Sequence, residues 1–470
     1  MLFRSAPLLA PIALVALAAC VPHLGQPPHV REASSLAAAQ SIPDENGAWP
    51  GDGWWRRYGD PQLDQLIAEG LTGSPDIQAA AARFARAEGV AQGDHAQIGP
   101  TLNGEGSAGK VKQSYNNGFP REFLPQGWRD TANLDLRAGF DLDLWGRNRA
   151  RLRGALADAN AARVEAAEAR LTLASSMAAA YADLARLFAE RDIAVQTVGL
   201  QRDTATLVAN RVREGLDTEG QRRQAESQIP AAQTDLAAID EQIATTRNRL
   251  AALMGAGPDR GLAITRPQLG AFTIAALPAS ARIDLVARRP DIVAARARVE
   301  AAAQRIKVAR AAFYPDLSLT GLVGLQALGF GNVLKSGSLY GNAGPAVTLP
   351  LFDSGARAGD LRVARGEYDA AVADYDRTLI AALEDVANAI ASRGSLMSQQ
   401  QTARASLLDS EEAFRIARLR YQGGLSTFLD VLSTEQAVVV ARRRVADLSA
   451  RAFTLDVALV RALGGGFAGA

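Results

Sequence analysis

The 470-residue sequence contains one pattern of marker residues twice. The segment Ser74-Pro75-Asp76-Ile77 returns as Arg289-Pro290-Asp291-Ile292, and Gly215-Leu216 returns as Gly424-Leu425. These matches carry weight because glycine and proline each mark a specific backbone event, whereas the many alanine matches do not. The repeat shift falls from 215 to 209 residues between Gly109 and Gly146, and we expect the six extra residues of the first copy in the polar loop 110–130. A duplicated unit of about 200 residues far exceeds a solenoid repeat, so each copy must form a structural half.

The bulk composition excludes several classes of function. Lysine and arginine total 51 against 50 aspartate and glutamate residues, so the chain lacks the basic excess of a nucleic-acid-binding protein. Few aromatic residues and many alanine, arginine, glutamate and leucine residues favour long, closely packed helices. The three histidines (His23, His29 and His95) form no metal-ligand pattern, and no catalytic triad, phosphate-binding glycine loop or cysteine pair is present. We therefore expect no enzymatic activity, cofactor or metal.

The first 60 residues have the features of a secreted lipoprotein. Arg4 precedes an apolar run over 6–19, which is too short to span a bilayer and has the length of a signal-peptide core. The run ends in Leu17-Ala18-Ala19-Cys20, which resembles a bacterial lipobox and predicts signal cleavage after residue 19 and acylation of Cys20, for example with palmitate. Val21, in place of an aspartate, favours the outer membrane. An ordinary signal peptide with an incidental cysteine is the alternative; in either case 20–60 is predicted to be a tether.

Residues 133–144 alternate between polar and apolar side chains, as expected for a β-strand. Leu134, Leu136, Ala138, Phe140, Leu142 and Leu144 form one face, and Asn133, Asp135, Arg137, Asp141 and Asp143 lie on the other. A soluble sandwich strand could alternate in the same way, but several charges on one face fit a water-filled lumen better. The second copy repeats the alternation, and Trp145 and Phe352 lie at equivalent strand ends, where a membrane interface favours aromatic residues.

A very long helical segment follows the strands in each copy. Residues 146–214 and 355–422 contain no proline, and each would extend about 100 Å at the helical rise of about 1.5 Å per residue. Each segment ends at a glycine and reverses into a shorter helix, 218–254 or 427–463. Thr218-x-x-Gln221 predicts a capping box at the first reversal, and Thr427-x-x-Asp430 predicts a related one at the second. We expect Pro230 to kink the first return helix.

These elements predict an α+β membrane protein made of two repeats. Four strands cannot close a barrel alone, and lipid tolerates only closed barrels, so the chain must supply part of a shared one. Three chains would give a twelve-stranded outer-membrane barrel, continued by an α-helical barrel of paired hairpins. The predicted order is: a first repeat over 61–255 with strands 101–109 and 131–144 and a tip at 215–218; an inter-repeat linker and equatorial segment over 256–288; a second repeat over 289–464 with strands 316–325 and 341–352 and a tip at 423–427; and a tail over 465–470.

The duplicated architecture, the lipobox and one sequence motif together resemble a known family. The motif is Arg420-Tyr421-x-x-Gly424-Leu425-Ser426-x-x-Leu429-Asp430-Val431-Leu432, and Trp54-Trp55 through Asp60-Pro61-x-Leu63 fits the same pattern. The chain resembles the TolC-type outer-membrane efflux lipoproteins of the NodT-like branch. This resemblance implies a homotrimer that crosses the outer membrane of a Gram-negative bacterium and extends into the periplasm. It also implies docking on a periplasmic adaptor and an inner-membrane pump, with passive passage of small-molecule substrates such as drugs.

The same resemblance implies roles for residues at the two tips. Contact with the adaptor is implied for Gly215, Leu216, Asp217, Gly424, Leu425 and Ser426, and lining of the closed periplasmic aperture is implied for Tyr421, Leu429 and Asp430. Three Asp430 carboxylates in a ring would favour cations, although Ser433 stands where a second acidic residue often occurs. Tyr421 could instead serve packing between helices, and Asp430 could act only as the cap partner of Thr427.

The leading hypothesis is the exit duct of a tripartite efflux system. One alternative is the exit duct of a type I protein-secretion system. A second, from another class, is a lipid-anchored periplasmic coiled-coil scaffold without a pore, which would leave the alternating strands unexplained. The repeats also differ at their tips, because Val212 and Gln221 occupy the positions equivalent to Tyr421 and Asp430. This difference predicts that the second hairpin carries the gate.

Overall fold

The computed structural model describes residues 21–116, 118–270, 272, 274–279 and 281–468, and divides the chain into two compact units. Unit 1 contains 84–162, 295–375 and the described residues before 31; unit 2 contains 31–83, 163–294 and 376–468. The predicted signal peptide and Cys20 lie outside the described residues. Both repeats contribute to both units, so the units do not coincide with the two copies of the sequence.

Helices, four of them very long, make up most of the described chain. Their bounds are α2 Pro61–Gly73, α3 Pro75–Ala96, α4 Arg147–Arg213, α5 Glu219–Leu253, α6 Asp259–Leu262, α7 Ala281–Arg288, α8 Pro290–Ala311, α9 Ala356–Gln422 and α10 Phe428–Ala462. The long helices and the return helices predicted from the sequence are confirmed to within about two residues. Helix α5 runs without interruption through Pro230.

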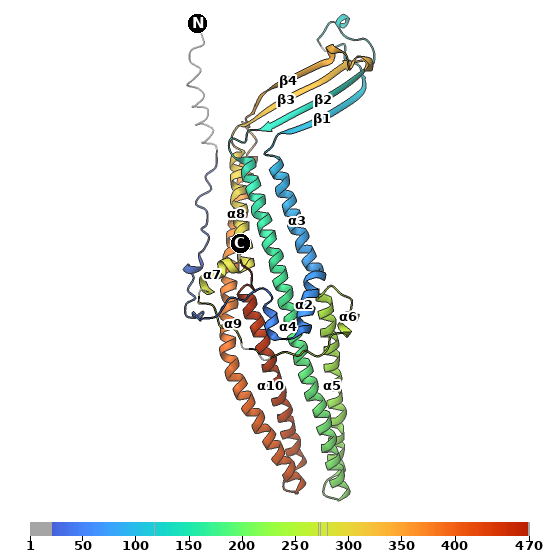
Figure 1. Ribbon diagram of the computed structural model, residues 1–470, viewed down its shortest axis with the longest axis vertical. Coiled ribbons are helices and arrows are strands. Elements are labelled where there is room, and N and C mark those ends of the chain that lie inside the picture. The colour runs from blue at the N-terminus through green and yellow to red at the C-terminus, as the bar shows by residue number, and fades with distance from the viewer. Residues whose placement is uncertain (1–20, 117, 271, 273, 280, 469–470) are drawn as a thin grey trace. The chain divides into compact units, whose positions relative to one another are not determined.

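Unit 1 carries one antiparallel sheet in the order β1-β2-β3-β4 (Figure 1). The strands are β1 Thr101–Val111, β2 Arg129–Asp141, β3 Asp316–Leu328 and β4 Leu339–Thr348. The register sets Leu134 of β2 opposite Gly106 of β1 and Leu325 of β3, so the apolar positions of neighbouring strands share a face. The hairpin from each repeat therefore joins the other hairpin edge to edge.

Two strands end earlier than the alternation in the sequence predicts. Strand β2 ends at Asp141 rather than at 144, and β4 ends at Thr348 rather than at 352. The reason in the first repeat is Asp143, which takes a left-handed conformation with φ of 44° and cannot continue a strand. Its carboxylate instead accepts hydrogen bonds from the backbone N–H groups of Asn148 and Arg149 at the start of α4. Alternation continues past the strand in the sequence, but the backbone has already turned.

Unit 2 is built around a core that joins the N-terminal segment to three helices. The 3-10 helix Trp54–Tyr58 packs with α2 against α4, α5 and α10. Tyr58 is fully buried, and its ring centroid lies 4.1 Å from that of Phe453. Its hydroxyl donates to the buried Asp456 at 2.6 Å, and Arg57 pairs with the same carboxylate. The Trp-Trp-Arg-Arg-Tyr segment is therefore a structural anchor.

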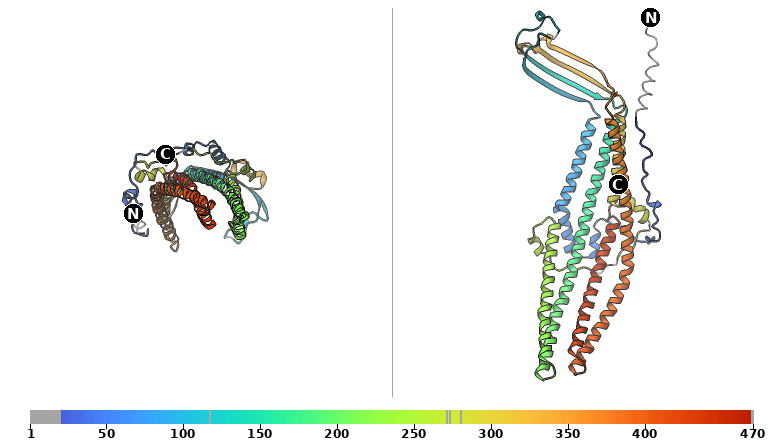
Figure 2. Two further views of the ribbon diagram at one scale, coloured as in Figure 1. Left: turned by 90° about the horizontal axis from the view of Figure 1, so that it is seen from below. Right: turned by 180° about the vertical axis from the view of Figure 1, so that it is seen from behind.

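The helical hairpins of the two repeats end side by side in unit 2. Helix α4 reverses into α5, α9 reverses into α10, and both reversals lie at the same end (Figure 2). A small apolar cluster fills the space between the tips; its buried members are Ala205, Val208, Ala225, Tyr421, Phe428 and Val431. Packing thus brings together two turns that are more than 200 residues apart in the sequence.

Candidate functional site

The sheet of unit 1 presents one apolar face that nothing in the described chain covers. Leu102 and Leu134 are 70% and 56% exposed, and Leu319, Val323, Leu339 and Val347 on the same face are also exposed. A face with this much exposed aliphatic surface is unfavourable in water and is typical of contact with lipid or another protein.

The opposite face of the sheet is polar and cross-linked. Arg137 lies 3.2 Å from Glu105 of β1 and 3.6 Å from Asp135 of its own strand. The hydroxyl of Tyr340 on β4 donates to Asp135 at 2.6 Å. The charged face predicted from the sequence is confirmed for Asp135 and Arg137. Asp143, which was also predicted on this face, lies instead in the turn after the strand. A polar face opposite an apolar one suits a water-filled lumen.

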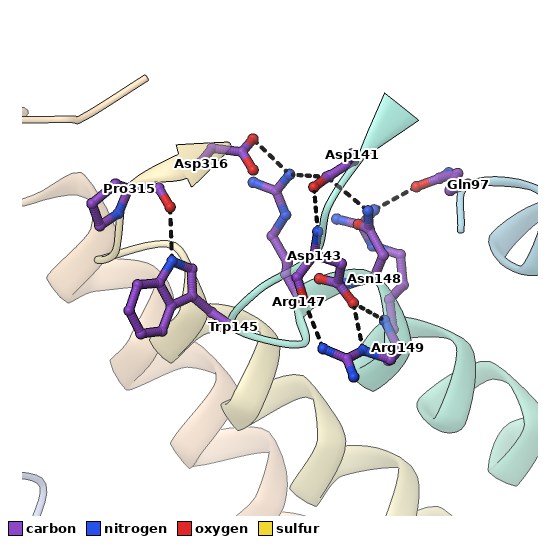
Figure 3. Close-up of polar contacts among 10 residues, drawn as sticks. Gln97, Asp141, Asp143, Trp145, Arg147, Asn148, Arg149, Pro315 and Asp316 are labelled. Carbon is purple, nitrogen blue, oxygen red and sulfur yellow. Dashed lines mark hydrogen bonds and ion pairs between the residues drawn. The ribbon is translucent and has the colours of Figure 1, made fainter. Parts of the chain in front are cut away.

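A dense polar network closes the junction between the sheet and α4 (Figure 3). The Arg147 guanidinium contacts Asp141 at the end of β2 at 3.2 Å and Asp316 at the start of β3 at 3.0 Å. Asn148 donates to Asp141 at 2.8 Å, and the indole N–H of Trp145 donates to the Pro315 carbonyl at 2.8 Å. Trp145 is therefore tied to the backbone at the strand end where the sequence predicts an interfacial aromatic residue. The network holds both repeats together where strand becomes helix.

The two tips share one backbone design. Gly215 and Gly424 have φ of 74° and 73°, the left-handed conformation that ends a helix with little strain only in glycine. Both capping boxes form: Thr218 and Gln221 bond reciprocally, and so do Thr427 and Asp430. The predicted caps are confirmed, and they give Asp430 a structural partner.

Apolar side chains at both turns point into solvent. Leu216 and Leu425 are 59% and 72% exposed, and Ser426 donates back to the Ala417 carbonyl at 3.3 Å. Leu429 is 65% exposed on the first turn of α10. The structure thus brings the predicted contact residues to one end, with leucines free to meet another molecule.

Tyr421 and Asp217 connect the two tips directly. The Tyr421 hydroxyl donates to the Asp217 carboxylate, and only 1% of Tyr421 is exposed. Arg211 of α4 donates from Nε to the same carboxylate at 2.8 Å, and its guanidinium lies 4.5 Å from the Tyr421 ring centroid. Burial, followed by the neighbouring Asp217 carboxylate, raises the pKa of Tyr421, so the phenol stays protonated and donates.

The structure gives these residues surroundings that their sequence positions did not predict. Asp217 was predicted as an adaptor contact, yet its side chain is only 6% exposed and faces the second hairpin. Arg211 was not predicted at all, because nothing in its helical surroundings distinguishes it from the many other arginines. Tyr421 was predicted for the aperture, and the structure places it in packing that includes an inter-hairpin hydrogen bond. The one signal for it in the sequence was that only the second repeat has a tyrosine at this position.

Asp430 and Glu435 lie five residues apart in the N-terminal part of α10 but differ sharply in environment. Asp430 is exposed, and hydrogen bonds from the Thr427 backbone and side chain hold its pKa below its usual range. Glu435 is fully buried, one carboxylate oxygen accepts from the Thr204 hydroxyl at 3.3 Å, and burial raises its pKa to about 7. Glu435 is therefore a second inter-hairpin contact, which no sequence pattern predicted.

Sequence comparison places the chain among known proteins. The profile of the family described as "Outer membrane efflux protein" matches residues 66–256 and 283–465. This chain belongs to that family. It is a non-enzymatic channel protein of outer-membrane efflux, and it carries the family's region twice, as the internal repeat predicts. A pore-free scaffold does not fit this membership.

Individual relatives agree with the family. The chain is 35% identical over 334 residues to the fusaric acid resistance protein FusA of Burkholderia cepacia, and the aligned segment covers 69% of this chain and 62% of FusA. It is 28% identical over 445 residues to the multidrug resistance outer membrane protein MdtP of Escherichia coli K12, covering 92% of this chain and 90% of MdtP. The crystal structure of the outer membrane protein VceC from Vibrio cholerae superposes with a TM-score of 0.85 at 39% identity, covering 89% of this chain and all of VceC.

Two further properties of the described residues bear on the site. None of the helices they form is both long and apolar enough to cross a membrane. They also contain no group of three or more histidine, cysteine, aspartate or glutamate side chains placed to hold a metal ion.

Proposed function

We propose that the chain is one subunit of a homotrimeric exit duct in a tripartite efflux system. The observation that carries this proposal is the sheet of unit 1, with an exposed apolar face, a charged face and two outer strands, β1 and β4, that pair on one side only. A sheet in lipid must be closed, because an unpaired edge leaves backbone groups without partners. Three copies of four strands would form a closed twelve-stranded barrel with the apolar face outward.

The helical hairpins supply the periplasmic end of the proposed duct. Exposed Leu216 and Leu425 at neighbouring turns offer apolar contacts of the kind that a helical adaptor could cover. We infer that the tips dock on a periplasmic adaptor, which couples the duct to an inner-membrane pump. FusA and MdtP carry the names of resistance to fusaric acid and to multiple drugs. These names support small toxic compounds as the class of substrate.

The link of Arg211, Asp217 and Tyr421 is the proposed gate latch. It joins the two hairpins of one chain through buried polar groups and leaves the exposed turns free. Separation of the hairpins would break the Tyr421–Asp217 hydrogen bond and the contact of the Arg211 guanidinium with the Tyr421 ring at once, so the latch favours the packed arrangement. Leu429 and Asp430 are proposed to line the aperture beside it, with Asp430 favouring cations.

Cys20 is the proposed lipid anchor, as in the NodT-like lipoproteins. The lipobox Leu17-Ala18-Ala19-Cys20 supports this, and so does the path of the chain just after it. Arg365 of α9 donates to the carbonyls of Leu24, Gly25 and Gln26, so these residues lie in unit 1 with the sheet. An acyl chain on Cys20 would therefore be tethered to the unit that enters the membrane.

Deletion and complementation in the native host test the proposed function. Loss of the gene should raise susceptibility to the pump's substrates, and the wild-type gene should restore resistance. A Leu216→Asp, Leu425→Asp double variant should reach the outer membrane, conduct ions in a planar bilayer and yet fail to restore resistance, because the tips no longer dock. A Lys307→Gln variant is the control and should behave as wild type. Unchanged susceptibility after deletion, in cells that express the matching pump, would contradict the proposal.

A further inference from the structure

The loops at the far end of the sheet hold most of the lysines of this chain. Only four of the 51 cationic residues are lysines, and Lys110, Lys112 and Lys335 lie there while Lys307 lies in α8. We call this end the loop rim and define it as residues 110–116, 118–130 and 329–339. With Arg121 and Arg129 the loop rim has five cations against two acids, whereas the whole chain has a net charge of +1. The positive charge is therefore concentrated locally.

Strand register brings both loops to one edge. Lys110 pairs with Asp130 at the loop end of the first hairpin, and Thr131 of this hairpin pairs with Leu328, the last residue before the loop of the second. The Gly329 N–H donates to the Asp130 carbonyl at 2.6 Å, which joins the two loops at their base. The helices attach at the opposite end of the strands, since α3 precedes β1 and α4 follows β2. The loop rim is therefore the outer end of the proposed barrel segment.

Lys110 lies on the same face as the aliphatic side chains. Residues 102, 104, 106 and 108 pair with 138, 136, 134 and 132, and Lys110 and Asp130 continue this apolar row. Their ion pair at 3.7 Å is weak, because the two side chains are 71% and 41% exposed. Within the part of the chain that the structure describes, Lys112 has no ion-pair partner within 4 Å. Both ammonium groups are available to an anion from outside.

Large apolar side chains alternate with these cations. Phe119, Phe123, Trp128, Phe330 and Leu334 are all more than half exposed in the loop rim. Aromatic rings beside cations at the end of an apolar band are typical of the lipid headgroup region. Lysine suits this position because its flexible stem can lie along apolar surface while the ammonium group reaches a phosphate.

We propose that the loop rim binds the phosphate groups of an anionic glycolipid of the outer leaflet through Lys110, Lys112 and Lys335. The outer leaflet of a Gram-negative outer membrane consists mainly of phosphorylated glycolipid, so the partner is a lipid with phosphates on its sugars. In this proposal, Lys110 contacts the glycolipid from the apolar face of the sheet, and Lys112 and Lys335 contact it from the loops. The inference rests on the proposed insertion of the sheet with the loop rim outward.

Vesicle binding by the detergent-purified full-length protein tests this inference. The probes are phosphatidylcholine vesicles that contain lipid A, and matched vesicles that contain the same lipid without its phosphates. Wild type should prefer the phosphorylated vesicles. The Lys110→Gln, Lys112→Gln, Lys335→Gln variant should lose about a hundredfold in affinity for them, about fivefold for each cation near an anionic surface. A variant with arginine at these three positions should retain binding within a few-fold.

A charge-matched control separates the loop rim from general electrostatics. Lys307→Gln, Arg310→Gln, Arg362→Gln removes three exposed cations of unit 1 outside the loop rim and should bind as wild type. Equal binding to both kinds of vesicle, or equal loss in the control, would overturn the inference. Conductance of each variant in a planar bilayer is measured in parallel. If the wild-type protein conducts but binds both kinds of vesicle equally, only the lipid inference is refuted. If the protein never conducts, the proposed duct is refuted.

Discussion

Removal of the Tyr421 hydroxyl is the sharpest test of the proposed latch. Tyr421→Phe keeps the ring, its position 6.1 Å from the Phe428 ring and its place below the Arg211 guanidinium. It removes only the hydrogen bond to Asp217. A hydrogen bond to a charged acceptor contributes about 1.5–3 kcal/mol. The equilibrium between separated and packed hairpins should therefore shift by about tenfold to a hundredfold in each chain.

Single-channel recording in planar bilayers measures this shift as a rise in the open fraction of the purified duct. Asp217→Asn should also raise the open fraction, because it replaces the charged acceptor of the Tyr421 hydroxyl with a neutral one. The double variant should open less than the sum of the single effects predicts, since both changes disrupt one interaction. Tyr368→Phe, whose hydroxyl makes only a 3.5 Å contact in unit 1, is the matched control. An unchanged open fraction in Tyr421→Phe, or strictly additive effects, would refute the latch.

Three further predictions concern stability. Glu435→Gln should stabilise the hairpin tips above pH 7. Burial raises the pKa of the wild-type carboxyl from 4.5 to about 7, so the free energy of unfolding of the wild type falls by about 3 kcal/mol as the pH rises through this window. The thermal unfolding midpoints of wild type and variant should therefore diverge from pH 5 to 8, and parallel midpoints would contradict this prediction. Asp456→Asn should destabilise unit 2 by about 1.5–3 kcal/mol, because it removes the charged acceptor of the buried Tyr58 hydroxyl; an unchanged denaturant midpoint would exclude this. Gly464→Ala should abolish folding, since its φ is 87° and a Cβ would lie 2.0 Å from the Arg288 carbonyl oxygen, whereas Gly89→Ala, with open space around it, should be tolerated in the same expression assay.

Local signals predicted most of the secondary structure. Helix ends followed from glycines, prolines and caps, and the reciprocal bonds of Thr218 with Gln221 form as their spacing predicts. Strand ends were less certain, because alternation in the sequence continues through Leu144 while the backbone turns at Asp143. A left-handed aspartate that caps the next helix leaves no periodic signature, so only the structure could place that boundary.

The functional site could be predicted only in part, for the same reason. Tyr421 stood out because the first repeat has Val212 in its place, but its partner could not be deduced. Asp217 looked like an exposed turn residue, and Arg211 looked like any other helical arginine. Their contact with Tyr421 spans more than 200 residues and depends on how two hairpins pack.

The sequence by itself determined the repeat, the alternating strands and the capped helical hairpins, because each depends on interactions between residues a few positions apart. The internal duplication also determined that two hairpins of each kind exist in one chain. Only the tertiary structure decided which side chains meet between them: Tyr421 with Asp217, Thr204 with Glu435, and Tyr58 with Asp456. These contacts depend on the register of helices that are distant in sequence, and that register is set by the packing of whole apolar faces.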